Sequence, residues 1–354
     1  MGVGGPARFL AEIRTEQQLL EALLFAQQHR LAAIAVGGGS NLLVQDEGYP
    51  GLVLRMAVAG PIEQVELGNR VEQNVPAGMS WDAFVLQTCE QGLSGVECLA
   101  GIPGMTGGTP VQNVGAYGQE VAQTVVSVRA LDRATQHFVR LSREECGFSY
   151  RSSLFNTRMR DRYLVTSVNF RLERNAAPPL GYADLRQYFG DEARPDALAI
   201  YHAVREIRGR KGMVLVAGDP DCRSAGSFFK NPVVEQGQLE AIAAARSLEV
   251  AAVPHWPVPG GPGVKLAAAW LVEQAGFGKG FALGEAGISS KHSLALINRT
   301  GRATFADIAR LRDLIRGEVQ LRFGVALEQE PIELGPGSVS AGERSYGVAA
   351  ALHG

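Results

Sequence analysis

The sequence has little of what marks membrane, nucleic-acid-binding or metal-binding proteins. Its formal net charge over 354 residues is −2, without a basic tract, so neither nucleic acid nor a membrane surface is expected as a partner. No apolar run is long enough to cross a bilayer, and the N-terminus has neither the basic nor the apolar region of a signal peptide. No Cys/His group has metal-ligand spacing, so no metal is expected. Together these absences indicate a cytoplasmic protein.

Cysteine is also scarce. The four cysteines are Cys89, Cys98, Cys146 and Cys222, and no two of them form a C-x-x-C pair. A chain of this length does not need disulfides to hold its core, so reduced thiols are expected. Hydrophobic residues make up 46% and charged residues 20%, which is ordinary for a globular protein, and the length predicts two or three domains.

Glycine, by contrast, is abundant, at 43 residues, and it is clustered. The clusters lie at Gly37–Gly39, within 101–118 and at 260–263. Glycine gathers where the backbone adopts unusual conformations or comes close to a ligand. These clusters are therefore the first candidates for a binding site.

Hydrophobic spacing predicts a mixed α+β architecture rather than a strict βαβ alternation. Helices are expected to open at Thr15, which heads a capping box, and at Ser80 and Thr304. Two further helices are expected over Tyr201–Lys211 and Val264–Ala275. Apolar and alternating runs predict strands over Leu31–Val36, Leu52–Arg55, Ile62–Leu67, Val71–Val75, Val125–Leu131, Phe138–Leu141, Leu164–Leu172 and Leu294–Ile297.

The loop Gly37–Asn41 follows a predicted buried strand. Three successive glycines allow backbone N–H groups to converge on an anion without interference from a Cβ, and Ser40 and Asn41 add side-chain donors. A tight turn between strands would show the same pattern, and the loop alone does not decide between the two. It has neither the G-x-G-x-x-G spacing of a Rossmann loop nor the G-K-[ST] of a P-loop, so a phosphate would be held by a different architecture.

The run 101–118 is rich in glycine yet too apolar for a linker. It reads GIPGMTGGTPVQNVGAYG, and few of its residues could pack a core. Such a composition suits backbone laid along an extended ligand, with amides facing phosphates and a flat ring. A long surface loop is the alternative, but long loops in compact domains are usually functional, which favours the ligand.

Three polar positions carry weaker signals. Arg151 follows Tyr150 and could offer a bidentate cation to a carboxylate or phosphate, although a loop arginine is usually solvated. Ser227 stands between a glycine and two aromatics and could donate a proton, but on its own it reads better as a cap beside a small core cluster. Glu330, read alone, is solvent-facing. There is no Ser-His-Asp order and no G-x-S-x-G motif, which disfavours hydrolase chemistry.

Seven runs, taken in order, resemble the flavin-dependent UDP-N-acetylenolpyruvoylglucosamine reductases (UDP-N-acetylmuramate dehydrogenases). The resemblance covers about the whole chain from Gly4 to Leu334, and its tyrosine-bearing run resembles the branch that carries a tyrosine loop over the substrate. The runs are GGGSNLLV (37–44), IPGMTGGTPVQNVGAYGQEV (102–121), ECGFSYRSSLF (145–155), YADL (182–185), AGSFFKNPVV (225–234), VKLAAAWLVEQAGFGKG (264–280) and RFGVALEQE (322–330).

The resemblance implies an α+β fold. An FAD-binding fold of the vanillyl-alcohol-oxidase type would occupy two subdomains, 1–60 and 61–205, followed by an α+β substrate-binding domain, 206–335, and a flexible tail, 336–354. The implied reaction is the NADPH-driven reduction of UDP-N-acetylenolpyruvoylglucosamine, a UDP-sugar, to UDP-N-acetylmuramate in peptidoglycan synthesis. Hydride would pass from flavin N5 to C3 of the enolpyruvyl group, and a proton from Ser227 to C2. A monomer is expected.

The resemblance also assigns roles to single residues. Those implied to be catalytic are Arg151, Ser227 and Glu330. Those implied to bind substrate are Tyr150, Tyr182, Lys211 and Asn231. Those implied to hold FAD without a covalent bond are Gly37, Gly38, Gly39, Ser40, Asn41, Ile102, Gly104, Gly107, Thr109, Asn113 and Gly115.

Two other functions stay open. An aldonolactone or alcohol oxidase on the same flavin fold often attaches flavin covalently to a His or Cys near the glycine loops, and none occurs in 37–44 or 101–118. A nucleotide-sugar sensor without activity would not need the three implied catalytic residues. The chain also departs from the family pattern: Ala282 stands where some members carry glutamine, and the chain starts inside an element that members begin earlier.

Overall fold

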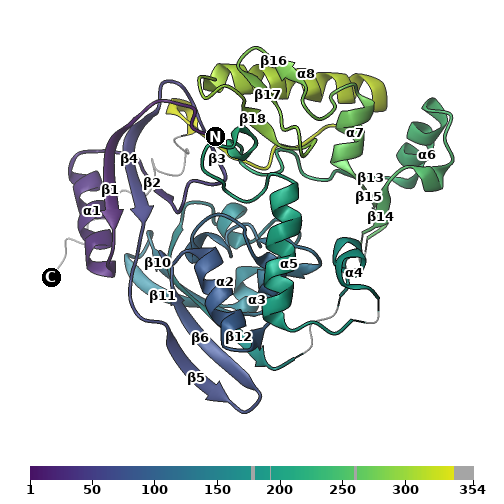
Figure 1. The fold of residues 1–354 in the computed structure, drawn as a ribbon. Coiled ribbons are helices and arrows are strands. Elements are labelled where there is room, and N and C mark those ends of the chain that lie inside the picture. The colour runs from purple at the N-terminus through teal and green to yellow at the C-terminus, as the bar shows by residue number, and fades with distance from the viewer. Residues whose placement is uncertain (177–179, 192, 259–260, 339–354) are drawn as a thin grey trace. The chain divides into compact units, whose positions relative to one another are not determined.

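The computed structural model describes residues 1–176, 180–191, 193–258 and 261–338. The chain forms two compact units, which are coloured by residue number in Figure 1. The expected tail, 336–354, lies outside the described residues from position 339 onward.

The two units are not two halves of the sequence. The larger unit contains Ala7–Gly39 and Tyr49–Arg210. The smaller unit contains Met1–Pro6, Ser40–Gly48 and Lys211–Pro336. The N-terminal residues and a short excursion from the first third of the chain therefore belong to the unit that is built mostly from later residues.

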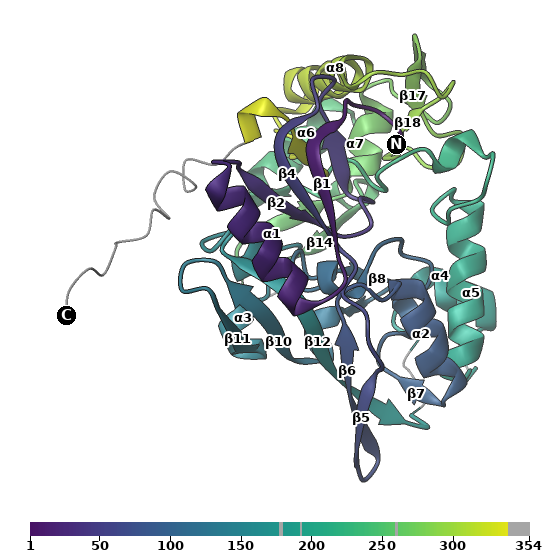
Figure 2. The ribbon, with the colours of Figure 1, turned by 90° about the vertical axis from the view of Figure 1, so that its left-hand side faces the viewer.

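One sheet of the larger unit is parallel, in the order β1 (Ala7–Ile13), β4 (Tyr49–Met56), β2 (Ala33–Val36). Helix α1 (Glu16–Gln28) packs against β1 and β4 (Figure 2). Thr15 caps α1 by accepting a hydrogen bond from the Gln18 N–H at 3.1 Å. The expected capping box does not close, because Gln18 Oε1 accepts from the Arg14 N–H instead.

The second sheet of the larger unit is antiparallel. In β6 the residues alternate between the core and more exposed positions, and Val71 and Val75 are fully buried. The sharp turn between β5 and β6 contains Gly68, whose φ of +69° favours glycine. The strand order is β11 (His137–Ser142), β10 (Val125–Asp132), β12 (Tyr163–Arg174), β6 (Arg70–Pro76), β5 (Glu63–Leu67), and β7 (Leu93–Ser94) also pairs with β12.

Helices α2 (Trp81–Glu90) and α5 (Ala197–Arg210) lie side by side on this unit (Figure 1). Trp81 and Phe84 of α2 are fully buried, and their ring centroids lie 5.8 Å and 5.2 Å from that of Phe170 on β12. This aromatic cluster fixes α2 on the sheet. The remaining short elements are α3 (Arg143–Cys146), α4 (Ala183–Phe189), β8 (Gly115–Ala116), β9 (Gln119–Glu120) and the 3-10 segments η1 (Glu97–Leu99), η2 (Thr106–Gly108), η3 (Val121–Gln123) and η4 (Leu154–Asn156).

Over the residues that the structure describes, the smaller unit contains three small sheets and three α-helices. Leu43, from the excursion Ser40–Gly48, is fully buried in the core of this unit together with Phe228 and Ile315. The sheets are β3 (Leu42–Val44) with β19 (Ile332–Leu334), β13 (Val233–Val234) with β15 (Val264–Leu266) and β14 (His255–Pro257), and β16 (Ala282–Leu283) with β17 (Ala286–Ile288) and β18 (Leu296–Asn298). The helices are α6 (Gln236–Ala245), α7 (Ala268–Gln274) and α8 (Phe305–Phe323), and the 3-10 segments are η5 (Pro220–Cys222), η6 (Val250–Ala252) and η7 (Pro336–Ser338).

One expected helix was wrong over its first residues. The helix expected over Val264–Ala275 begins only at Ala268, because Val264–Leu266 form β15 and pair with two neighbouring strands. A short apolar run does not distinguish a strand from a helix, and here tertiary pairing decides. The helix expected to open at Thr304 is confirmed: Thr304 caps α8, and Asp307 is the reciprocal partner of a capping box.

The four cysteines are free thiols, as expected. Burial raises the pKa of both Cys89 and Cys146 to about 12, so both stay protonated and unreactive near neutral pH. Over the described ranges, no helix has the length and apolar character to cross a membrane, and no group of three or more His, Cys, Asp or Glu side chains is arranged to hold a metal ion.

Candidate active site

Two glycine-rich segments of the larger unit approach each other backbone to backbone. Gly37, Gly38 and Gly39 directly follow β2. A Cβ built on Gly38 would lie 3.1 Å from the Cα of Gly104, so a side chain there would push the two segments apart. Gly39 has a φ of +69°, and the chain passes into the smaller unit at the next residue, Ser40.

The segment around Gly104 is held by the start of α2. Gly104 has a φ of +134°, and its carbonyl oxygen accepts a hydrogen bond from the Trp81 N–H at 3.1 Å. Thr106 N–H donates to the Met79 carbonyl at 2.9 Å. The backbone of this segment is therefore a fixed surface, as a loop that carries a cofactor needs to be.

Three other predicted cofactor residues already have packing roles. A Cβ on Gly107 would lie 2.5 Å from the Cβ of Ala77, so packing alone requires glycine there. Thr109 is buried, and its hydroxyl donates to the Thr106 carbonyl at 2.8 Å. Ile102 is half-buried against the core of the larger unit. A contact of any of them with a cofactor stays a prediction.

At Gly108, neither tight packing nor an unusual backbone angle requires glycine. It is exposed, its φ lies outside the left-handed region, and no atom lies within 4 Å of a Cβ built on it. A Cβ on Gly39 would also meet open space. Bare backbone at these positions leaves room for a flat or extended ligand against the chain, which fits a bound dinucleotide.

Arg151 lies at the tip of the tight turn Ser149–Ser152. Its φ of +53° is uncommon for a residue other than glycine. Its Nη2 donates to the Gly115 carbonyl at 2.7 Å, and its Cζ lies 5.5 Å from the ring centroid of Tyr150, which is exposed. Asn156 Nδ2 donates to the Arg151 carbonyl at 3.2 Å. The backbone and the guanidinium of Arg151 are therefore both held.

Gly115 leaves the space that this guanidinium occupies. A Cβ on Gly115 would lie 3.1 Å from Arg151 Nη1 and 2.8 Å from the Cγ of Glu120, its partner across the β8–β9 hairpin. Asn113, just before the hairpin, is buried and donates from Nδ2 to Glu120 Oε2 at 2.8 Å. The end of the glycine-rich run thus forms the site, or seat, in which the guanidinium group of Arg151 is held.

Tyr117 and Tyr182 meet edge to face beside this seat, with ring centroids 5.2 Å apart and planes at 78°. Tyr182 precedes α4 and keeps 43% of its surface exposed. Burial raises the pKa of Tyr117 to about 12. Burial also lowers the pKa of Arg208 on α5, and the positive charge of Arg151 acts in the same direction.

In the smaller unit, the structure brings the segments of Ser227 and Glu330 together. Phe229 and Gln329 form an antiparallel bridge, and Glu330 N–H donates to the Phe228 carbonyl at 2.9 Å. Phe228 and Phe229 are buried, whereas Ser227 and Glu330 are half-buried. Two segments about 100 residues apart in the chain, one carrying a hydroxyl and the other a carboxyl group, are therefore paired through their backbones.

Asn41 belongs to the same surface. Its Nδ2 donates to the Glu330 carbonyl at 3.3 Å, and its own carbonyl accepts from the Ile332 N–H at 2.9 Å, at the start of the β3–β19 pairing. Ser40, beside it, is half-buried. The glycine loop thus continues directly into the segment that supports Glu330.

The remaining predicted substrate residues also lie in the smaller unit. Asn231 Oδ1 accepts from the Ala268 N–H at 3.0 Å, at the start of α7, so its amide group is fixed. Lys230 forms an ion pair with Glu328. Lys211 is half-buried and is the first residue of this unit after α5.

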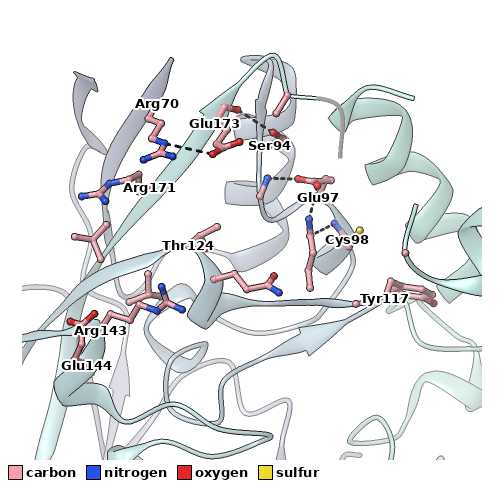
Figure 3. A pocket seen from close by; sticks show the side chains of 18 residues that line it. Arg70, Ser94, Glu97, Cys98, Tyr117, Thr124, Arg143, Glu144, Arg171 and Glu173 are labelled. Atoms are coloured by element: carbon pink, nitrogen blue, oxygen red, sulfur yellow. Dashed lines mark hydrogen bonds and ion pairs between the residues drawn. The ribbon is translucent and has the colours of Figure 1, made fainter. Parts of the chain in front are cut away.

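A cavity of about 710 Å³ opens in the larger unit beside Tyr117 and Gly118, at the tip of the β8–β9 hairpin (Figure 3). The charges in its lining balance, so the cavity favours neither anions nor cations, and among the described residues that line it none is a predicted catalytic residue. The charged lining residues are Arg70, Arg143, Arg171, Glu97, Glu144 and Glu173.

Glu97 in this lining is a buried acidic residue that sequence reasoning missed. It is fully buried and accepts hydrogen bonds from the Gly95 N–H and from Gln119 Nε2, each at 2.5 Å (Figure 3). Gln119 Oε1 in turn accepts from the Cys98 N–H at 2.8 Å. Glu97 thereby anchors strand β9. The only signal in the sequence was an acidic residue inside the apolar run Val96–Ala100.

Comparison with known proteins places both units. The family model described as FAD binding domain matches residues 7–142, and the one described as UDP-N-acetylenolpyruvoylglucosamine reductase, C-terminal domain, matches residues 219–334. The chain is similar to the UDP-N-acetylenolpyruvoylglucosamine reductase of Thermobifida fusca (strain YX), with 44% identity over 95% of each chain. With that of Nocardia farcinica (strain IFM 10152) it shares 44% identity, over 94% of this chain and 86% of the relative. Among solved structures, the UDP-N-acetylenolpyruvylglucosamine reductase of Thermus caldophilus matches with a TM-score of 0.60 and 27% identity over 92% of each chain.

Proposed function

The chain belongs to the UDP-N-acetylenolpyruvoylglucosamine reductase family, and we propose that it carries out this reaction with Arg151, Ser227 and Glu330 as its catalytic residues. The reaction reduces UDP-N-acetylenolpyruvoylglucosamine to UDP-N-acetylmuramate in peptidoglycan synthesis, and the family uses FAD and NADPH. The observation that carries the assignment is the 44% identity over 95% of the chain. The predicted order of an FAD-binding domain followed by the C-terminal domain of this reductase family, in a mixed α+β fold, is confirmed.

The cofactor would be held along the glycine strip, which we define as Gly37–Gly39 together with the segment from Gly104 to Gly108. The bare backbone at Gly39 and Gly108 and the close approach of Gly38 to Gly104 support this placement. FAD, when bound, supplies the hydride that adds to C3 of the enolpyruvyl group, and the protein supplies orientation and electrostatics. In this proposal, residues 1–60 and 61–205 are the two FAD-binding subdomains, and residues 206–335 are the substrate-binding domain.

Arg151 is proposed to pair with the substrate carboxylate. As C3 gains a hydride, negative charge develops on C2 and on the carboxylate, and a cation that is already in place stabilises it without reorganisation. The double hold on Arg151, at its carbonyl and at its guanidinium, supports such preorganisation. Glu330 is proposed to share the same carboxylate oxygen when protonated, or to orient the arginine.

Ser227 is proposed to donate the proton to C2. Its half-buried position before two buried phenylalanines supports a hydroxyl that is shielded from bulk water. The backbone pairing of its segment with that of Glu330 supports a shared role. Lys230, three residues further along, could ease the loss of this proton.

Tyr150, Tyr182, Lys211 and Asn231 are proposed to grip the UDP-sugar. The exposed ring of Tyr182, which rests edge-on against Tyr117, supports a tyrosine-bearing segment that covers substrate. The enzyme is further proposed to act in the cytoplasm as a monomer.

A coupled assay on the purified protein tests the function. The visible spectrum is recorded, and NADPH oxidation is then followed with and without UDP-N-acetylenolpyruvoylglucosamine. A flavin spectrum with substrate-dependent loss of NADPH is expected. Flavin without substrate-dependent turnover would contradict the reaction while leaving the cofactor site intact. A colourless protein that FAD does not reconstitute would contradict the cofactor site.

A further inference from the structure

The side chain of Asn113 is fully engaged in the larger unit. The residue is 1% exposed and has a φ of +44°. Its Nδ2 donates to Glu120 Oε2 at 2.8 Å and to the Ser149 carbonyl at 3.0 Å, and its Oδ1 accepts from the Ala122 N–H at 3.1 Å. One amide group therefore joins two segments of chain that are far apart in sequence.

Each partner of Asn113 belongs to an element that touches Arg151. Ser149 opens the tight turn in which Ser149 and Ser152 exchange backbone hydrogen bonds of 2.9 Å and 3.1 Å, with Arg151 between them. Glu120 lies across the β8–β9 hairpin from Gly115, the residue whose carbonyl holds the guanidinium. Asn113 thus ties the backbone of the arginine turn to the hairpin that holds the arginine head group.

We propose that Asn113 is a positioning residue for Arg151. It fixes the turn and the hairpin relative to each other, and so sets the direction of the guanidinium. This proposal rests on the catalytic role proposed above for Arg151. A flavin contact by Asn113 stays a prediction. The side-chain amide already makes three hydrogen bonds within the protein.

The position requires an amide, because one end group must supply two donors and one acceptor. Aspartate has the same shape, but at neutral pH it only accepts hydrogen bonds. Asn113→Asp would face the Glu120 carboxylate and the Ser149 carbonyl without a donor, while it could still accept from Ala122. The arginine turn would lose its tie to the hairpin, and the oxygen-bearing partners would repel the new carboxylate.

The test compares the two half-reactions of the holoenzyme by stopped flow in Asn113→Asp, Arg151→Ala and the double variant. Asn113→Asp is expected to slow flavin reduction by NADPH much less than it slows oxidation by substrate. Oxidation of the reduced enzyme by UDP-N-acetylenolpyruvoylglucosamine is expected to slow by about 100-fold, as for a misplaced catalytic group. In the Arg151→Ala background, the same substitution should add less than about threefold, because residues that act as a unit are not additive.

A donor–acceptor exchange gives a second readout. Adding Glu120→Gln to Asn113→Asp lets a glutamine donate to the new carboxylate, and it should recover about tenfold of the lost oxidation rate, since one of the lost ties returns. A merely structural role would predict that both half-reactions are lost and recovered together, whereas a positioning role predicts that the effect falls mainly on oxidation by substrate. If Asn113→Asp does not accumulate as holoenzyme, Asn113→Ser, which adds no charge, is measured against Arg151→Ala in the same way.

Additive losses in the double variant, or equal slowing of both half-reactions, would overturn the positioning role. An unchanged oxidation rate in Asn113→Asp would do the same. If Arg151→Ala itself oxidises at the unchanged rate, the catalytic role of Arg151 fails, and the positioning role fails with it. The Arg151→Ala measurement therefore separates a failure of the proposed function from a failure of this inference.

Discussion

The carbonyl oxygen of Gly115 accepts a hydrogen bond from the guanidinium of Arg151 at 2.7 Å, and the missing side chain of Gly115 leaves the space beside the same guanidinium. Gly115 therefore does two things for Arg151: it provides an acceptor and it provides room. Neither depends on an unusual backbone angle, because Gly115 does not have a φ in the left-handed region.

Gly115→Ala should disturb Arg151 more than it disturbs the fold. The new Cβ would lie 3.1 Å from Arg151 Nη1 and 2.8 Å from Glu120 Cγ, so one of these side chains must move. Oxidation of the reduced enzyme by substrate is expected to fall by about 10- to 100-fold, with flavin reduction by NADPH preserved. Stopped-flow measurement of both half-reactions checks this. Equal losses in both would point to general damage at the hairpin.

Gly107→Ala and Gly108→Ala form a matched pair. The first places a Cβ 2.5 Å from that of Ala77, so the apoprotein should lose about 1–3 kcal/mol of unfolding free energy. The second meets no atom within 4 Å, so the apoprotein should lose no stability. Gly108→Ala should instead weaken FAD binding by about tenfold, equivalent to about 1.4 kcal/mol. Urea unfolding and FAD titration of the apoproteins measure the two effects. An unchanged FAD affinity in Gly108→Ala would show that this residue does not contact the cofactor.

Ser227→Ala removes the proposed proton donor without adding volume. Flavin reduction by NADPH should be nearly unchanged, because that step needs no proton at C2. Oxidation by UDP-N-acetylenolpyruvoylglucosamine should slow by about 100- to 10,000-fold, the usual range for loss of a positioned acid. The two half-reactions are again measured separately. Loss of both to the same extent would refute the proton-donor role.

Tyr117 should give the protein a distinct alkaline transition. Burial raises its pKa from the ordinary value of 10.0 to about 12. The unfolded chain therefore releases this proton first, so its contribution to stability is present below pH 10 and is lost as the pH rises toward 12. Urea midpoints at pH 9 and pH 11 should fall more for the unchanged protein than for Tyr117→Phe. Identical falls would show that Tyr117 ionises as freely in the folded protein as in the unfolded chain.

Local pattern was enough to predict much of the fold. The long helix after Thr304 and five strands of the antiparallel sheet formed where expected, whereas the short strand β7 was not predicted. The helix prediction was wrong over Val264–Leu266, because the conformation of these residues depends on pairing with strands from elsewhere in the chain. Periodicity does not record such pairing. The resemblance supplied the family and the candidate residues, but not their partners.

The partners could not be predicted because they are set by tertiary contacts. Nothing in the run 101–118 shows that Gly107 is needed for packing against Ala77 whereas Gly108 is not. Likewise, no motif marks Glu97 as the buried anchor of β9, or joins Asn113 to the turn of Arg151. Each of these relationships links residues tens of positions apart, beyond the reach of a local pattern.

The excursion Ser40–Gly48 has a consequence for any attempt to take this protein apart. Leu43 is a core residue of the smaller unit, and its strand pairs with Ile332–Leu334, almost 300 residues later in the chain. A fragment that begins at Lys211 would lack this strand and leave a hole where Leu43 belongs. We therefore expect neither a single proteolytic cut nor a truncated gene to yield the smaller unit as an autonomous module; swapping it between relatives would require three grafted segments.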